Sequence, residues 1–244
     1  MRKLMFLILI LLAMGCNDEL EAKPNLLKSL DELYANTSIR GLAEAAGNGD
    51  VKLIEKLAAK GVDVNSTGAN GMPVLFWPLR EQNKEGFQKL LEMGANPDLQ
   101  WSTGSSITEL VAGIEDTDYL NMVLKAGGNP NLINAKSNKP PIFQAVKFGF
   151  LDNIKILLDS GADIDNATNS AGETPIFDAL ALGDYKTALF LAKSGANLKV
   201  TDTWGNPVGF SLKNRLDTPE IGDSNYQYYR EFLSILNADP IKQQ

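Results

Sequence analysis

A short motif recurs along this chain at an almost constant interval. Glycine followed by a second small or apolar residue returns at intervals of 33, 33, 34 and 34 residues, at Gly61-Val62, Gly94-Ala95, Gly127-Gly128, Gly161-Ala162 and Gly195-Ala196. A second series keeps nearly the same interval, at Pro73, Ser106, Pro141, Pro175 and Pro207. A period of roughly 20 to 50 residues is typical of stacked structural repeats. The sequence therefore predicts one elongated array, in which each unit contacts its neighbours.

The pattern within each interval predicts two helices. In residues 174–195, Pro175 lies in the first turn of the first helix, where a missing N–H costs little. Gly183 ends that helix, and the second helix then presents an apolar face made of Tyr185, Ala188 and Leu191. Residues 141–161 repeat this arrangement. We therefore expect an all-α fold of helix–turn–helix repeats joined by loops.

The second repeat departs from this pattern at Pro78. A proline inside a helix removes a hydrogen bond and clashes with the preceding turn, at a cost of about 3 kcal/mol. Trp77, just before it, is also disfavoured in helical geometry. The sequence therefore predicts an irregular first helix in this repeat.

The motifs resemble those of the ankyrin repeat, which opens with Thr-Pro-Leu-His-x-Ala and closes with Gly-Ala-Asp. Residues 174–179 read Thr-Pro-Ile-Phe-Asp-Ala, and residues 161–163 read Gly-Ala-Asp. Phe143 and Phe177 stand where the family has histidine. The resemblance implies an ankyrin-repeat solenoid over residues 38–214, with loop fingers and a concave face. A tether and capping helix in 16–37 and a capping helix in 215–244 would close its two ends.

The first residues indicate a targeting segment. Arg2 and Lys3 precede an apolar run from Leu4 to Met14, which is shorter than the roughly 20 residues that span a bilayer. The segment ends at Gly15-Cys16 and resembles a bacterial lipoprotein signal. That resemblance implies removal of residues 1–15 and a lipid on Cys16. The alternative is an ordinary secretory signal that ends beside an incidental thiol.

The amino-acid composition argues against several classes of function. The chain has no histidine, so it cannot build a Ser-His-Asp or Cys-His nucleophile or a histidine zinc site. Its net charge of −7 argues against nucleic-acid binding. We find no catalytic constellation, and we expect no enzyme activity, cofactor or metal.

Two oxygen-rich stretches are candidate chemical sites. Asp163-Ile164-Asp165-Asn166 with Asn169 suggests a calcium loop, but the terminal glutamate of an EF-hand is absent and a structural turn explains the residues as well. Glu115-Asp116-Thr117-Asp118 is typical of an exposed loop with a helix N-cap. We favour the structural interpretation for both.

Aromatic residues are the better candidates for binding. Alignment by the glycines places Trp101 and Trp204 on the fingers and Phe148 at the concave end of a first helix; the alternative for each ring is packing between neighbouring fingers. Phe76 and Trp77 fall at inward-facing positions and are expected in the core. Lysines could add a basic strip or could simply be scattered over a solvated face: Lys136, Lys139 and Lys147.

A repeat array presents an extended surface, so we expect a protein partner and a monomer when free. An acidic ankyrin-like lipoprotein resembles the immunity proteins that accompany phospholipase effectors of type VI secretion. This resemblance implies a lipid anchor at the periplasmic face of a bacterial membrane and a secreted lipase as the partner. Asn17 after the cysteine favours the outer membrane over the inner one. The alternative is a scaffold or protective factor for another envelope protein.

Overall fold

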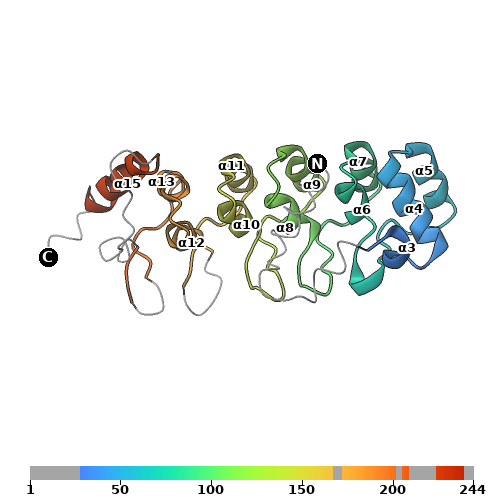
Figure 1. Ribbon diagram of the computed structural model, residues 1–244, viewed down its shortest axis with the longest axis horizontal. Helices are drawn as coiled ribbons and strands as arrows, with labels where there is room; N and C mark the ends of the chain where they lie inside the picture. Colours follow the sequence, from blue (N-terminus) through green and yellow to red (C-terminus); the bar gives the residue numbers. More distant parts are fainter. Residues whose placement is uncertain (1–27, 167–171, 202–204, 209–223, 239–244) are drawn as a thin grey trace.

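Five helix pairs stand side by side in the described part of the chain (Figure 1). The structure is a computed structural model that describes residues 28–166, 172–201, 205–208 and 224–238. The first helices of the pairs are α4 (Thr37–Asn48), α6 (Phe76–Arg80), α8 (Ile107–Ala112), α10 (Ile142–Lys147) and α12 (Pro175–Ala181). The second helices are α5 (Val51–Ala59), α7 (Lys84–Glu92), α9 (Thr117–Lys125), α11 (Leu151–Asp159) and α13 (Tyr185–Lys193).

The helix pairs form two rows with loops below them. In Figure 1 the second helices make the upper row, the first helices lie beneath, and the loops between repeats hang downward as fingers. The 3-10 turn η1 (Ala69–Gly71) lies in the first finger, and isolated antiparallel bridges join Thr67 to Pro73 and Thr201 to Pro207. The fold is therefore helical, as the sequence predicts.

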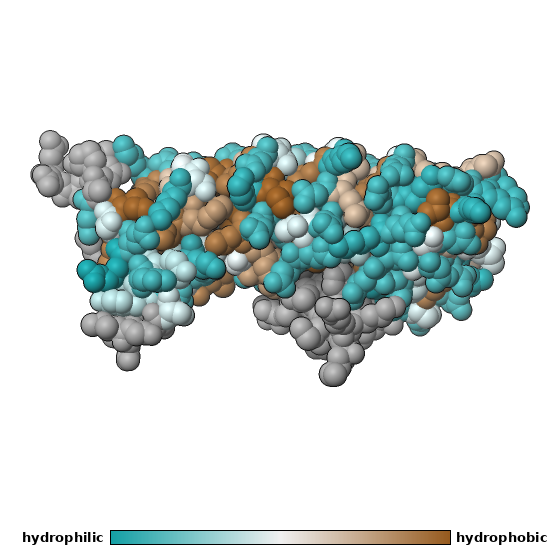
Figure 2. Space-filling model, turned by 90° about the horizontal axis from the view of Figure 1, so that it is seen from above, coloured by the Kyte–Doolittle hydropathy of each residue, from teal (hydrophilic) through white to brown (hydrophobic). Residues whose placement is uncertain are grey.

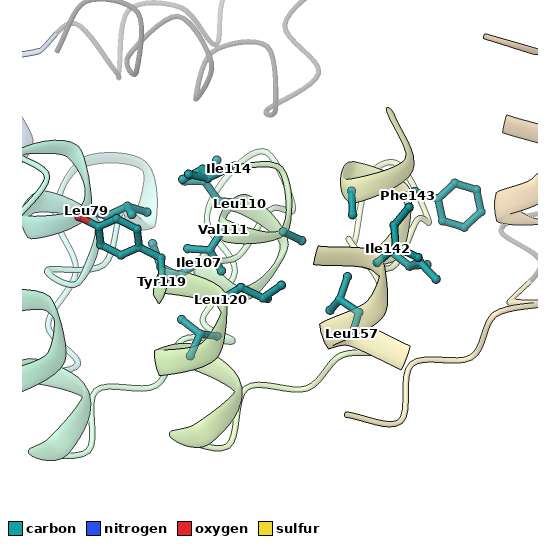
Figure 3. Packing of buried hydrophobic residues seen from close by; sticks show 14 of the residues in the cluster. Leu79, Ile107, Leu110, Val111, Ile114, Tyr119, Leu120, Ile142, Phe143 and Leu157 are labelled. Atoms are coloured by element: carbon teal, nitrogen blue, oxygen red, sulfur yellow. The ribbon is translucent and has the colours of Figure 1, made fainter. Parts of the chain in front are cut away.

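A single apolar cluster runs through the stack from Leu33 to Leu236. Figure 3 shows its middle part, where residues of α8 and α9 lie against residues of the neighbouring pairs. Ile107, Leu120 and Ile142 are fully buried there. Each helix pair thus buries its apolar faces against the next pair, which is why one repeat alone would not be stable.

The row of second helices faces solvent. Seen from above in Figure 2, this side is mostly hydrophilic, with hydrophobic residues showing as separate patches that are more extensive over the C-terminal repeats on the left. Within the described ranges, no helix combines the length and apolar character required to cross a bilayer.

Helical segments cover both ends of the stack. The N-terminal helix α3 (Leu30–Leu33) lies within residues 16–37, where a tether and capping helix are expected and of which residues 28–37 are described. Behind it, the buried Tyr34 donates a 2.8 Å hydrogen bond to the Pro73 carbonyl and packs edge-on against Trp77. At the other end, α15 (Tyr226–Ala238) buries Phe232 and Leu236 against the last pair.

A ladder of hydrogen bonds joins the bases of successive fingers. In each link a side-chain oxygen accepts the backbone N–H of a residue 31 or 32 positions later, at 2.7 to 3.0 Å. The acceptors recur at the repeat interval and are Asn65, Asp98, Asn131 and Asp165. These side chains fix the position of each finger relative to the next.

Pro78 lies in the first turn of α6 and not in its interior as predicted, although α6, with five residues, is the shortest of the five first helices described. Helix α6 begins at Phe76, so Pro78 lies in its first turn, where a backbone N–H has no helical partner in any case. The carbonyl of Val74, in the turn before the helix, accepts from the Trp77 N–H at 3.0 Å. Trp77 itself is within the helix. The proline therefore costs far less than one in a helix interior.

Candidate functional site

Trp101 is buried, with 4% of its surface exposed. Its ring lies 6.5 Å from the ring of Phe76, and a Cβ added to Gly71 would lie 3.5 Å from the Trp101 Cα. Beside it, the Ser102 N–H donates to the carbonyl of Asn70 at 2.9 Å. The preceding finger therefore covers this tryptophan. The expectation that Trp101 is exposed for a partner is wrong, and the alternative of packing between fingers is correct.

Trp204 and Cys16, also singled out from the sequence, lie outside the described residues. So does Asn169 of the suggested calcium loop. Phe76 and Trp77 are buried in the core, as expected.

The three lysines do not form a basic strip. The Lys139 ammonium lies 2.6 Å from a carboxylate oxygen of Asp178 and over the ring of Phe143, so its charge is paired. Lys136 is exposed on a finger, whereas Lys147 lies at the far end of α10, over the ring of Phe148 at 5.5 Å. The charge of Lys139 is therefore used within the protein and is not available to a basic strip.

The side chains of the oxygen-rich stretches accept hydrogen bonds from backbone N–H groups. Asp116 caps α9 by accepting from the Asp118 N–H, and Asp163 accepts from the Asp165 N–H at 3.0 Å. Asp165 then makes the finger link to Asn197. Across the described ranges, no group of histidine, cysteine, aspartate and glutamate side chains is arranged to hold a metal ion.

Glu109 of α8 is a buried acid that ties three segments together. Its two carboxylate oxygens accept from Asn134 of the next finger at 2.7 Å and from Gln144 of α10 at 3.2 Å. Burial raises the pKa of this carboxyl, and the hydrogen bonds to Asn134, Gln144 and Ser105 oppose that rise. These contacts show that Glu109 stabilises the packing of repeat three against repeat four.

Phe148 is half-buried at the turn between α10 and α11. Its ring stacks on that of Phe150, with centroids 5.7 Å apart and planes 22° from parallel. Leu182, 34 residues later, occupies the matching turn of the next repeat and is 57% exposed. The two turns are in contact, because a Cβ added to Gly149 would lie 2.9 Å from a carboxylate oxygen of Asp184. We call Phe148, Phe150 and Leu182 the turn patch.

Phe150 occupies a position that the other repeats use for helix capping. In those repeats the N-cap side chain of the second helix accepts a backbone N–H from the first turn. The capping residues are Asp50, Asn83, Asp116 and Asp184. Phe150 makes no such bond. An N-cap side chain contributes about 0.5–2 kcal/mol, so repeat four lacks stabilisation that its neighbours have.

Sequence reasoning missed Phe150 and Leu182. Alignment on Gly49, Gly149 and Gly183 could have found Phe150, because it places this ring where aspartate follows the other two glycines. Leu182 could have been found as the counterpart of Phe148. Of the proposed binding residues, Phe148 and Lys147 lie at this site, and Lys136 and Lys139 belong to the preceding finger.

Comparisons with known proteins agree with the repeat architecture. Residues 110–202 match the family model described as ankyrin repeats (3 copies). The chain is 29% identical over 122 residues to Protein PhlB of Serratia liquefaciens, covering 50% of this chain and 53% of that protein. It is 31% identical over 86 residues to ankyrin repeat domain-containing protein 40 of Mus musculus, covering 32% and 24% respectively. The chain thus spans about half the length of one relative and a quarter of the other.

A solved structure extends this agreement over most of the chain. The ankyrin repeat domain of human ASB11 superposes with a TM-score of 0.62 at 21% identity, covering 80% of this chain and 82% of that one. The chain therefore carries ankyrin repeats, and its fold is an ankyrin-repeat solenoid, as the resemblance implied. Arrays of this kind are typically binding modules that contact other proteins.

Proposed function

We propose that this ankyrin-repeat chain is a non-catalytic immunity protein that binds and inhibits an antibacterial phospholipase effector, while a lipid on Cys16 holds it at the periplasmic face of a bacterial membrane. The repeat array supports binding to a protein. The charged start, the apolar run and the cysteine at its end support the anchor. An inhibitor anchored there would be held where the effector attacks lipid.

The main support for the binding function is that Phe150 stands where the second helices of the other described repeats have an N-cap side chain. Phe150 forgoes a stabilising hydrogen bond that the other four described repeats make, and its ring stacks on Phe148, in a turn that contacts the turn carrying the exposed Leu182. Residues that break a local stability rule concentrate at functional sites. A partner that covers the turn patch would bury these side chains and offset the missing cap.

A direct assay tests the inhibitory role. The full chain would be mixed with an antibacterial phospholipase, taken from the neighbouring gene where that gene encodes one, and release of fatty acid from lipid would be followed. We expect a stoichiometric amount of the chain to abolish hydrolysis. Undiminished hydrolysis at a large excess of the chain would refute the immunity role, and binding without inhibition would instead favour the scaffold alternative.

Phe150→Asn separates binding from stability. Asparagine is among the best N-cap residues, so the new cap offsets the lost ring stacking and the free energy of unfolding should stay within about 1 kcal/mol of wild type. Affinity for the partner should fall about tenfold or more, because an aromatic anchor is lost. Urea unfolding and titration calorimetry measure the two quantities. Phe150→Ala restores no cap and should be about 1 kcal/mol less stable than Phe150→Asn. Equal affinity in all three proteins would show that the partner does not use the turn patch.

Cys16→Ser tests the anchor. Without the thiol no thioether to a diacylglycerol can form, so labelling with a radioactive fatty acid should disappear and the protein should be left unprocessed or become soluble. Acyl labelling that persists in this variant would exclude Cys16 as the attachment point.

A further inference from the structure

The turns between first and second helices form one continuous edge of the molecule. Lys84 of repeat two contacts Asp116 of repeat three, with 2.7 Å between the charged atoms. Asn153 of repeat four donates to the Ile114 carbonyl of repeat three at 2.6 Å. Gly149 of repeat four lies against Asp184 of repeat five. We call residues 81–85, 114–118, 147–152 and 181–186 the turn edge.

The charge of the turn edge changes along its length. Residues 81–85 and 115–118 hold five carboxylates and one lysine. Glu85, Glu115 and Asp118 are exposed, and the single ammonium of Lys84 lies between Asp116 and Asp118. The segments of repeats four and five carry the turn patch together with two lysines and two aspartates, whose formal charges balance: Lys147, Asp152, Asp184 and Lys186. An acidic part in repeats two and three is thus continuous with a part in repeats four and five that has no net formal charge and contains the turn patch.

We propose that the turn edge binds a partner polypeptide in two parts, with apolar side chains on the turn patch and lysine or arginine residues against the acidic part. This rests on the protein-binding function proposed above and specifies the chemistry of the partner. The chain's net charge of −7 attracts a basic surface, and the acidic part fixes which end of the partner lies where. A membrane is a poor occupant, because anionic headgroups would face these carboxylates.

The dimensions fit a single helix or an extended segment. Neighbouring helices pack about 8–10 Å apart, so four repeats extend over roughly 30 Å. A helix of about 20 residues has that length. One such element could place leucine side chains on Phe148, Phe150 and Leu182 while its basic residues reach Glu115 and Glu85.

Two synthetic peptides test this proposal. Each peptide has 20 residues, and both share the same leucine-rich half. The other half carries four lysines in one peptide and four glutamates in the other. Each peptide is also made with its two halves exchanged, so that both orientations along the turn edge are tested. Fluorescence anisotropy against the full chain should show at least tenfold tighter binding of a lysine peptide, with an advantage that shrinks as salt is raised. Equal binding of lysine and glutamate peptides would overturn the proposal.

Substitutions in the turn edge test which part of it contacts which half of the peptide. Glu85→Gln with Glu115→Gln should remove most of the preference for lysine and leave the glutamate peptide little changed. Phe150→Asn changes no charge, so it should weaken both peptides by a similar factor. The charge variants are surface substitutions and should unfold at the same urea concentration as wild type. A lysine preference that survives the double charge variant would overturn the proposal.

Two further measurements separate the possible failures. Tight, Phe150-dependent binding to vesicles of anionic lipid would identify a lipid surface as the occupant and overturn the polypeptide assignment. If the chain inhibits its phospholipase but does not discriminate between the peptides, the turn-edge proposal fails while the immunity function stands. If the peptides are discriminated but no phospholipase is inhibited, the immunity function fails and the basic partner is still to be found.

Discussion

Gly86→Ala should lower the free energy of unfolding by about 3 kcal/mol, because among the described glycines it brings an added Cβ nearest to another atom. Gly86 is buried in the first turn of α7, where that helix passes α4. An added Cβ would lie 1.9 Å from the carbonyl oxygen of Ala46 and 2.7 Å from its carbonyl carbon. Both are backbone atoms, so no side-chain rotation can relieve the clash, and the two helices must separate. Urea unfolding followed by circular dichroism measures the loss.

Gly41→Ala is the matched control. Gly41 also lies in a helix, α4, but the atom nearest to its added Cβ is a methyl of Leu57 at 3.8 Å, an ordinary contact. This substitution should raise stability by up to about 1 kcal/mol through helix propensity alone. If the two alanine variants changed stability by the same amount, the close approach of α4 and α7 would not be a constraint on this fold.

Asn153→Ala should also lower the free energy of unfolding by about 3 kcal/mol. The side chain of Asn153 is fully buried in α11 and donates to the Ala112 carbonyl at 3.0 Å and the Ile114 carbonyl at 2.6 Å. These carbonyls lie at the C-terminal end of α8, where helical partners run out. Alanine would leave both acceptors without this donor inside the protein. The same urea titration applies.

Two further variants identify the cause of that loss. Asn153→Leu fills the space without supplying donors, so a similar loss would assign the effect to hydrogen bonding rather than to a cavity. Asn121→Ala removes an exposed asparagine that donates within its own helix to the Thr117 carbonyl, and it should cost at most about 0.5 kcal/mol. A cost for Asn153→Ala no greater than for Asn121→Ala would contradict the assigned role.

The repeat pattern predicted the array and its helix pairs because it depends on local chemistry. Gly49, Gly149 and Gly183 have φ angles of 72°, 66° and 71°, a left-handed geometry that glycine adopts without strain. Each lies between a first and a second helix, as its position in the sequence predicts. Such signals act over a few residues, so one repeat could be compared with the next.

Exposure was harder to predict, because it depends on how neighbouring repeats lie together. Trp101 follows a polar finger pattern, yet the finger around Asn70 and Gly71 reaches over it. Asn70 itself has a φ angle of 58°, which nothing in the repeat pattern indicates. The start of α6 relative to Pro78 was likewise set by the turn before it. One of the three turn-patch residues, Phe148, was therefore predicted from its register, whereas Phe150 and Leu182 were recognised only in the structure.

The finger ladder has a consequence for how such a chain changes length over generations. Each link needs only an asparagine or aspartate at one position and a backbone N–H about one repeat further on, so the donor side chain does not matter. Deletion or duplication of one whole interval would bring an equivalent acceptor against an equivalent donor. Recombination between genes for such chains can therefore add or remove repeats while both junctions stay intact. The helices that cover the two ends of the stack would be unaffected by such an exchange.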